Sequence, residues 1–391
     1  MSNKVVIVGA KRTPIGSFQG QFSSVPADEL GAAAIKGALE QSGVSPEAVD
    51  DVLMGCVLPA GVGQAPARLA SRKAGIPTSA GAVTINKACG SAMKTMQIGH
   101  DQILVGSANI VVAGGMENMT LAPYLMPKAR GGYRMGHGEV LDHMFYDGLQ
   151  NPDDNLMMGV FGERCAEKFN FTREQQDAFA VASIERALEA MKSQFKDEIT
   201  PVTVTSRRGE SVFSEDQEPP SCNIGKIPAL RAAFKKDGTV TAASSSKISD
   251  GAAATVLMSE QRAADMGLIP LATIIAHSTY SQDPEWFTTA PIGAIELVLK
   301  KAGWNIDDVD LFEVNEAFAT VTMAAMHELN IDHDKMNVNG GACALGHPIG
   351  ASGARVVVTL INALRQRGLK KGVAALCIGG GEATALAIEL P

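Results

Sequence analysis

Three residues in glycine-rich surroundings could together perform covalent and acid–base chemistry. Cys89 lies where a predicted strand gives way to a predicted helix, and His347 and Cys377 lie beside glycines near the end of the chain. A thiol can form an acyl thioester, an imidazole can take its proton, and a second thiol can move a proton from carbon. Few reactions need all three groups.

The surroundings of Cys89 leave two interpretations open. Free cysteine is among the most buried residue types, so Cys89 could be a small core residue. Its position just before a predicted helix favours a reactive thiol instead, because a helix N-terminus lowers the pKa of a thiol. Gly90 and Ser91 leave room for a substrate beside it.

The glycines around His347 and Cys377 favour a functional role for both residues. Gly346 precedes His347, and the glycines 379–381 follow Cys377 closely. Glycine permits unusual dihedral angles and a close approach of the backbone to a ligand. A phosphate-binding loop with a bystander cysteine is the weaker interpretation of Cys377, because no GxxxxGK[ST] or GxGxxG pattern follows it.

Asn315 ends another predicted strand, and its role is open from the residues alone. Its side chain could form an Asx turn or cap a helix. It could equally hold a water molecule or a developing oxyanion.

The composition indicates a globular protein with an aliphatic core. Of 391 residues, 46% are hydrophobic, 19% charged and only 5% aromatic. No apolar run is long enough to span a bilayer, and a net charge of −8 argues against nucleic acid or a membrane as partner. The chain runs directly into the apolar stretch Val5–Val8 without a signal peptide, so we expect a cytoplasmic protein with reduced cysteines. The six cysteines lack the spacing of a zinc site, so we expect no metal.

An internal repeat predicts the fold. Residues 34–50 match residues 294–310 without a gap, and each copy has a glycine and an aspartate at equivalent positions. Each copy predicts an amphipathic helix, a loop and a strand. The second half continues with a predicted strand at 335–340, a helix from about Ala351 and a strand at 373–379. Strands that alternate with helices predict a duplicated α/β fold with a parallel sheet and helices on both faces.

The repeat divides the chain into three parts. We predict an N-terminal core half at 1–117 plus 250–270, an inserted segment at 118–249 and a C-terminal core half at 271–391. The inserted segment contains Pro and Gly clusters and a predicted helix capped by Thr172. A long insertion in a compact fold is usually a lid, a binding loop or an assembly element.

At this point the residues match a known family. The chain resembles the thiolases, and among them the biosynthetic acetoacetyl-CoA thiolases (acetyl-CoA C-acetyltransferases). The resemblance runs end to end, and its active-site signatures are Asn315-Glu316-Ala317-Phe318, Gly346-His347-Pro348-Ile349-Gly350 and Cys377-Ile378-Gly379-Gly380-Gly381. It implies a five-layer α/β/α/β/α core, a loop domain at 118–249 that binds coenzyme A, and a homotetramer with contacts from 131–144.

The resemblance also implies catalytic roles. Cys89 would be the acylated nucleophile, with His347 taking its proton. Cys377 would remove the α-proton of a second acetyl-CoA, or return it during cleavage. The backbone N–H groups of Cys89 and Gly379 would hold one oxyanion, and His347 with a water on Asn315 would hold the other.

The matched positions suggest which residues bind the substrate. Those along the pantetheine channel would be Leu149, Met158, Ala242, Ser246, Ala317 and Phe318, with Met157 beside them and Phe287 tightening the acyl pocket. Two departures from the family put acyl-chain selectivity in question: Met157 stands where the short-chain enzymes usually have His, and Lys247 replaces a small residue. A third, the loss of a nucleotide-contacting Arg near Pro219-Pro220, concerns the CoA nucleotide.

The sequence therefore predicts an acetyl-CoA C-acetyltransferase that condenses two acetyl-CoA through an acetyl-Cys89 intermediate. It would need no metal or redox cofactor, and a monovalent cation remains possible. The nearest alternative is a 3-ketoacyl-CoA thiolase of β-oxidation with longer substrates. A decarboxylating ketosynthase is disfavoured by the second thiol, Cys377, and a non-catalytic acyl-CoA binding protein is disfavoured by the intact set of catalytic groups.

Overall fold

The computed structural model describes residues 4–207 and 209–391. Its core is built from two halves with the same order of elements. The strands of the first half are β1 (Val5–Arg12), β3 (Asp51–Gly55), β4 (Gly81–Ile85), β5 (Ile110–Asn118) and β10 (Ser249–Ser259), and the short β2 (Gly16–Ser17) pairs with the start of β10. Its helices are α1 (Ala27–Ser42), α2 (Pro66–Lys73), α3 (Ser91–Leu104) and α6 (Glu260–Asp265).

The second half repeats this pattern. Its strands are β11 (Ala272–Ser281), β12 (Leu311–Val314), β13 (Lys371–Ile378) and β14 (Glu382–Glu389). Its helices are α7 (Ala290–Ala302), α8 (Ala319–Leu329), α9 (Ala342–Leu345) and α10 (Ser352–Arg367).

The repeat found in the sequence has a structural counterpart in both halves. Helices α1 and α7 each end at a glycine with a φ of 71°, Gly43 and Gly303. The Oδ2 atom of Asp50 accepts hydrogen bonds from two successive backbone N–H groups at the start of β5. Asp310 makes the same pair of bonds at the start of β13. The aspartates thus fix the same strand in each half.

The strands follow the order β12-β13-β14-β11-β1-β10-β5-β3-β4. Among the strands of the described residues, the two halves pair where β1 lies beside β11 over Val5–Ile7. The prediction of a parallel sheet is wrong in part: β3 is parallel to β4 and β5, and β12 to β13, but β1, β10, β11 and β14 pair antiparallel. The reason is local, because β14 follows β13 through a short glycine turn, which antiparallel strands allow.

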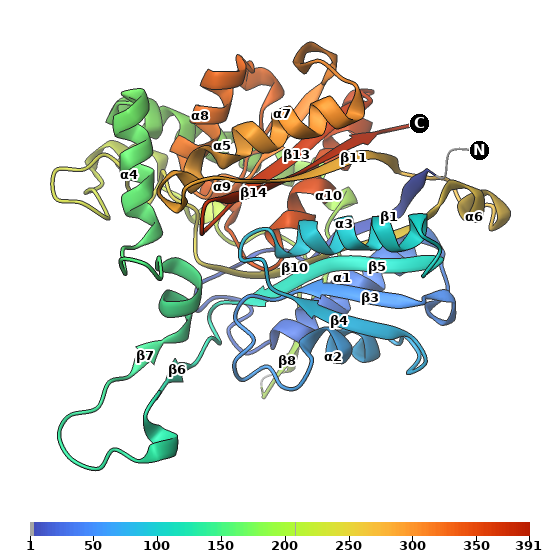
Figure 1. Ribbon diagram of the computed structural model, residues 1–391, viewed down its shortest axis with the longest axis horizontal. Helices are drawn as coiled ribbons and strands as arrows, with labels where there is room; N and C mark the ends of the chain where they lie inside the picture. Colours follow the sequence, from blue (N-terminus) through green and yellow to red (C-terminus); the bar gives the residue numbers. More distant parts are fainter. Residues whose placement is uncertain (1–3, 208) are drawn as a thin grey trace.

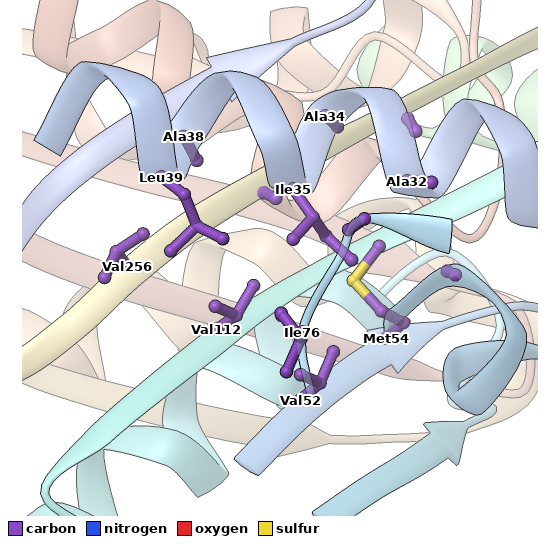
Figure 2. Close-up of a cluster of buried hydrophobic side chains, with 14 of the residues drawn as sticks. Ala32, Ala34, Ile35, Ala38, Leu39, Val52, Met54, Ile76, Val112 and Val256 are labelled. Carbon is purple, nitrogen blue, oxygen red and sulfur yellow. The ribbon is translucent and has the colours of Figure 1, made fainter. Parts of the chain in front are cut away.

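Three apolar clusters account for the layers. The first packs α1 and α2 on the outer face of the first half, including Ile35, Leu39, Val52, Val112 and Val256 (Figure 2). The second lies between the halves and contains residues of α3 and α10. The third packs α7 on the outer face of the second half. Helices and sheets therefore alternate as predicted, and in Figure 1 the first half (blue to cyan) lies below the second (orange to red).

A predicted strand at 335–340 does not form. Met336 makes one isolated bridge to Phe312, and Asn337 has a φ of 46° that ends the extended backbone. The Asn337 side chain takes over the pairing, since its Oδ1 accepts from the Val314 N–H and its Nδ2 donates to the Val314 carbonyl. A side-chain amide therefore replaces a strand in the second half.

The segment between β5 and β10 carries elements without counterparts in the other half. They are β6 (Tyr124–Leu125), β7 (Leu141–Asp142), α4 (Met158–Phe169), α5 (Arg173–Lys192), β8 (Val202–Ser206) and β9 (Gly209–Phe213). Thr172 caps α5 in a capping box with Gln175. The connection between β6 and β7 projects away from the core (Figure 1). No helix among the described residues is long and apolar enough to cross a membrane.

Candidate active site

Cys89 lies in a tight turn between β4 and α3. Ala88 has a φ of 42°, a left-handed conformation that is strained for a residue with a Cβ atom. The Asn86 side chain accepts from the Ala88 N–H at 2.9 Å, while the Ser91 hydroxyl donates to the Ala88 carbonyl at 2.7 Å. The same hydroxyl accepts from the Lys87 N–H at 2.8 Å. Side-chain bonds therefore stabilise the strained turn that presents Cys89.

The thiol of Cys89 is not the low-pKa thiol expected from its place at a helix start. Burial raises the pKa of Cys89 to about 11, although the N–H groups of Gly379 and of Cys89 itself lower it. Desolvation of a thiolate outweighs the helix terminus here. Cys89 consequently needs a base to take its proton.

The strand end that carries Cys377 lies against the Cys89 turn. A Cβ atom on Gly90 would come within 2.3 Å of Ile378 Cδ1, so this close contact requires glycine. Gly379 directs its N–H toward the Cys89 sulfur. Gly380 and Gly381 then reverse the chain with φ values of 94° and 89°. The glycines that marked this segment in the sequence thus bring the two cysteine-bearing segments together.

Cys377 is fully buried, and burial raises the pKa of its thiol well above the ordinary value. Charge on Cys89 and on Cys165 raises the pKa of Cys377 further. A thiolate of high pKa is scarce but strongly basic once it forms. That property suits removal of a weakly acidic proton from carbon.

His347 is held in one orientation by its own loop. Gly346 has a φ of 110°, and its backbone lies so close to Ser249 that a Cβ atom would come within 2.0 Å of Oγ. The His347 N–H donates to the Lys247 carbonyl at 3.0 Å, and its Nδ1 is bonded to Ser352 Oγ. The Ser352 hydroxyl donates to the Pro348 carbonyl at 3.0 Å, so it must accept from Nδ1–H. This leaves Nε2 without a proton.

The electrostatics keep His347 neutral. Burial lowers the pKa of His347 to about 3, and the nearby Arg355 guanidinium lowers it further. Its Nε2 is buried and has no hydrogen-bond partner. A neutral imidazole with a free, unprotonated nitrogen is ready to act as a base.

Asn315 lies directly after β12 and is fully buried. Its Oδ1 accepts from Arg355 at 3.3 Å, and Arg355 also pairs with Glu313 at 2.8 Å. Its Nδ2 is buried without a partner. Because buried polar atoms are normally satisfied, the free Nδ2 donor and the free His347 Nε2 are candidates to bind a ligand or a water.

Glu117, at the end of β5, connects three segments around the site. Its carboxylate accepts from the N–H groups of Val57, Leu58 and Gly350 at 2.8 to 3.0 Å. Burial raises the pKa of Glu117 to about 7, and those three donors lower it. Glu117 therefore anchors the loop that carries His347 to the first half of the core.

A cavity of about 370 Å³ opens beside these groups. Its walls include His347 and most of the residues expected in the pantetheine channel: Leu149, Met157, Met158, Ala242, Ser246 and Phe318. One side of it is an apolar cluster with Ile349 and Met119, against which Cys89 packs. Another side is a cluster with Phe318 that contains Cys377. Both cysteines therefore pack in clusters that contribute walls to the cavity, and His347 lines it directly.

Two expected substrate contacts lie elsewhere. Ala317 and Phe287 pack in the buried cluster with Phe318 and Cys377, where the Phe287 ring meets Phe161 with centroids 5.7 Å apart. They support the wall of the cavity from behind. Aromatic side chains that sequence reasoning missed do line it, namely Phe18, Phe145 and Phe234.

Sequence reasoning also missed three polar residues. Arg355 orients Asn315, Ser352 orients His347, and Glu117 anchors the His347 loop. Arg355 and Glu117 could have been found, because each is a charged residue inside an apolar element of the sequence. Ser352 offers no such signal.

Outside this site, the described residues 4–207 and 209–391 contain one group of side chains with the potential to bind a metal ion. The ligand atoms of His100, Asp101 and His277 lie within 4.8 Å of one another. In the structure these side chains bond to each other, since Asp101 Oδ1 is 3.0 Å from a nitrogen of each histidine.

Comparison with known proteins shows the family of the chain. The N-terminal domain model of the thiolase family matches residues 5–261, and its C-terminal domain model matches residues 268–390. The chain therefore belongs to the thiolase family. Its fold is the duplicated five-layer thiolase fold.

Two curated relatives and one solved structure match over nearly the whole chain. An acetyl-CoA acetyltransferase of Pseudomonas aeruginosa is 49% identical over 98% of this chain and 98% of that protein. One of Chromobacterium violaceum is 48% identical over 99% of this chain and its own full length. The crystal structure of the Bacillus anthracis acetyl-CoA acetyltransferase superposes with a TM-score of 0.97 at 42% identity, covering 100% of this chain and 99% of the other.

Proposed function

We propose that this protein is an acetyl-CoA C-acetyltransferase that reversibly joins two acetyl-CoA into acetoacetyl-CoA and free CoA. The observation that carries the proposal is a cavity lined by His347 whose walls belong to the apolar clusters that contain Cys89 and Cys377. The full-length similarity to acetyl-CoA acetyltransferases supports the same substrates.

In the first step, Nε2 of His347 takes the proton of Cys89 as the sulfur attacks the thioester carbonyl. Burial lowers the pKa of His347 and raises the pKa of Cys89, so neither the imidazolium nor the thiolate is stable alone in this site. We therefore expect the proton transfer and the attack on the carbonyl to occur together. The N–H groups of Cys89 and Gly379 hold the oxyanion. CoA then leaves with the proton from His347, and acetyl-Cys89 remains.

In the second step, Nε2 of His347 takes the thiol proton of Cys377, and the resulting thiolate takes the α-proton of a second acetyl-CoA. The negative charge that develops on the thioester oxygen is held by Nε2–H of His347 and by a water on Nδ2 of Asn315. The enolate carbon attacks acetyl-Cys89, and the carbon–sulfur bond breaks to release acetoacetyl-CoA. The Cys89 sulfur takes the proton from Nε2 of His347, and Cys377 keeps the α-proton, so all three groups return to their starting state. Once Cys89 is acylated its sulfur cannot ionise, so the Cys89 charge that would raise the pKa of Cys377 cannot form.

We assign the pantetheine arm of CoA to the cavity lined by Leu149, Met158, Ala242, Ser246 and Phe318. These side chains offer an apolar passage with a few hydrogen-bonding groups, which suits a long, thin amphipathic ligand. Met157 on the same wall is an apolar residue that would widen tolerance for acyl chains. The reaction as we write it uses neither a metal nor a redox cofactor.

We also propose that the protein is a homotetramer and acts in the cytoplasm. β4 is an edge strand with Val83 48% exposed, and the 124–142 connection carries Tyr124 and Met135 at 69% and 97% exposure. Exposed edges and apolar tips are usually covered by a partner. Both reactive thiols must stay reduced, which suits a reducing compartment.

Thiolysis assays test the substrate. We expect CoA-dependent cleavage of acetoacetyl-CoA to be at least about tenfold more efficient, in kcat/KM, than cleavage of 3-keto-octanoyl-CoA. A preference for the eight-carbon substrate would instead assign the protein to fatty-acid degradation. Absence of thiolysis with acyl-CoA binding retained would favour a binding protein.

Two cysteine variants test the roles. Cys89→Ser should lose acyl-enzyme formation, and turnover should fall by at least about a thousandfold. Cys377→Ser should still become acetylated on Cys89, seen by mass spectrometry after incubation with acetyl-CoA, but should not form acetoacetyl-CoA. Equal loss of acetylation in both variants would contradict this division.

A further inference from the structure

Residues 241–247 form one wall of the substrate cavity. Ala242, Ser245, Ser246 and Lys247 all line it. The segment is paired with the chain after Asn315, since the Ser246 N–H donates to the Ala317 carbonyl at 3.0 Å and the Ala319 N–H to the Ser244 carbonyl at 2.8 Å. These bonds hold one edge of the segment and leave two carbonyl oxygens to be satisfied in another way.

The Lys247 ammonium satisfies these two oxygens. Its Nζ donates to the carbonyl of Ala242 and, at 3.4 Å, to that of Ser245. Among residues 4–207 and 209–391, no other group donates to either oxygen. Converging carbonyl dipoles repel each other, and a cation between them removes that repulsion.

The backbone of Lys247 reaches the catalytic base. Its carbonyl accepts from the His347 N–H at 3.0 Å and from the Ser249 hydroxyl at 2.9 Å. One residue thus joins the wall of the cavity to the loop that carries His347. The Lys247 side chain is hydrogen-bonded to the cavity wall, and the Lys247 carbonyl is hydrogen-bonded to the loop that carries His347.

We infer that the Lys247 ammonium is a tethered cation that holds residues 242–247 in the shape that receives the pantetheine arm of an acyl-CoA. Lys247 is a positioning residue, and the inference rests on the proposed function. An ammonium and a free monovalent cation such as K⁺ both bind clusters of carbonyl oxygens. With the cation built into the chain, the wall is ordered without an added ion.

Two consequences follow for the enzyme. Activity of the wild type is independent of K⁺ when the ionic strength is held constant. Removal of the ammonium weakens binding of CoA more than it slows turnover, because the backbone bond to His347 survives the substitution.

The test compares wild type with Lys247→Met, which keeps the aliphatic stem and loses the charge. We expect the Kd for CoA, measured by calorimetry, and the KM for acetoacetyl-CoA to rise about tenfold, as for the loss of a hydrogen bond to a charged group. The kcat should change by less than about threefold. Added K⁺ or methylammonium should restore CoA affinity, and choline at equal ionic strength should not, because it is too large for the space.

Two further variants serve as controls. Lys247→Arg keeps the charge and should retain CoA affinity within about threefold. Lys192→Met removes the same charge from the exposed end of α5, where Lys192 pairs only with Glu189, and should change nothing. Thermal unfolding of each variant separates local from global effects.

The inference is overturned if Lys247→Met binds CoA as wild type does, if no small cation restores a lost affinity, or if the wild type itself requires K⁺. The calorimetric measurement needs no turnover. A wild type that binds CoA without thiolysis would therefore refute the proposed function. The effect of Lys247→Met on the Kd for CoA would still decide the inference about Lys247.

Discussion

The Nδ1 atom of His347 is hydrogen-bonded to the hydroxyl of Ser352, whose own proton goes to the Pro348 carbonyl. This chain of two bonds selects the tautomer in which Nε2 is free. Ser352 is the first residue of α10, so the helix fixes both the position and the protonation of the base. In a neutral imidazole, the hydrogen bond made by one ring nitrogen determines which tautomer is present and so which nitrogen can act as the base.

Substitution of Ser352 should therefore impair catalysis without removing the base. Ser352→Ala leaves Nδ1 unpaired, so the imidazole can rotate and adopt the other tautomer. We expect kcat for thiolysis to fall roughly ten- to hundredfold with KM nearly unchanged. Ser352→Thr keeps the hydroxyl and should recover most of the rate. A fall in KM or an equal loss in both variants would argue for a packing defect instead.

The alkylation of Cys89 should depend on pH as a high-pKa thiol does. Because burial raises the pKa of Cys89 to about 11, the thiolate fraction of the free enzyme grows with every step of pH up to that value. The iodoacetamide reaction, followed by mass spectrometry of the Cys89 peptide, should accelerate steadily from pH 6 to pH 10. A plateau below pH 8 would show that the helix terminus dominates after all.

The sequence predicted the groups at this site better than their electrostatic state. Cys89, His347 and Cys377 could be selected because glycines surround them, and in the structure other parts of the chain leave no room for a Cβ atom at Gly90, Gly346 and Gly381. The pKa of Cys89 could not be predicted, since it depends on burial by segments far away in the chain. The sequence shows that Cys89 lies before a helix, but it does not show the desolvation, which has the larger effect on the pKa of Cys89.

The fold likewise has features that the sequence predicts and features that it does not. The duplication was visible because Asp50 and Asp310 perform the same task in both halves. The absence of a strand at 335–340 was not visible in the sequence. It depends on the side chain of Asn337, which is hydrogen-bonded to Val314, a residue distant in the sequence. Strand direction was likewise hidden, since antiparallel pairing of β10 and β14 depends on connections rather than on residue type.

The buried pair of Arg355 and Glu313 should be coupled in stability and in catalysis. Burial raises the pKa of Glu313 to about 8 although Arg355 lowers it, so Arg355→Met would leave Glu313 as a neutral carboxyl without its partner. We expect a loss of about 1–3 kcal/mol in the free energy of unfolding, the cost of an unsatisfied buried polar group. The double variant Arg355→Met with Glu313→Gln should differ from Arg355→Met by less than about 1 kcal/mol at neutral pH, because Glu313 is already uncharged once Arg355 is gone. Chemical unfolding of the three variants and wild type completes the cycle.

The same substitution should change the titration of the base. Arg355 lowers the pKa of His347, so Arg355→Met should raise that pKa toward the ordinary value of histidine. When the pH is lowered, the acetylation rate of the variant should therefore begin to fall at a higher pH than the acetylation rate of wild type. Identical acid limbs in the two proteins would mean that burial alone sets the pKa.

Two matched glycine substitutions should separate conformational strain from steric conflict. Gly303 has a φ of 71° with open space around its Cβ position, so Gly303→Ala should cost about 1–2 kcal/mol, the strain of a left-handed residue.

Gly346 has a φ of 110°, and a Cβ atom there would lie 2.0 Å from Ser249 Oγ, which must move. Ser249 also bonds the Lys247 carbonyl that holds His347, so the conflict reaches the base. We expect Gly346→Ala to cost more than Gly303→Ala in urea unfolding and, unlike it, to reduce kcat more than about tenfold. Equal effects of both substitutions on kcat would show that the close packing at Gly346 does not position His347.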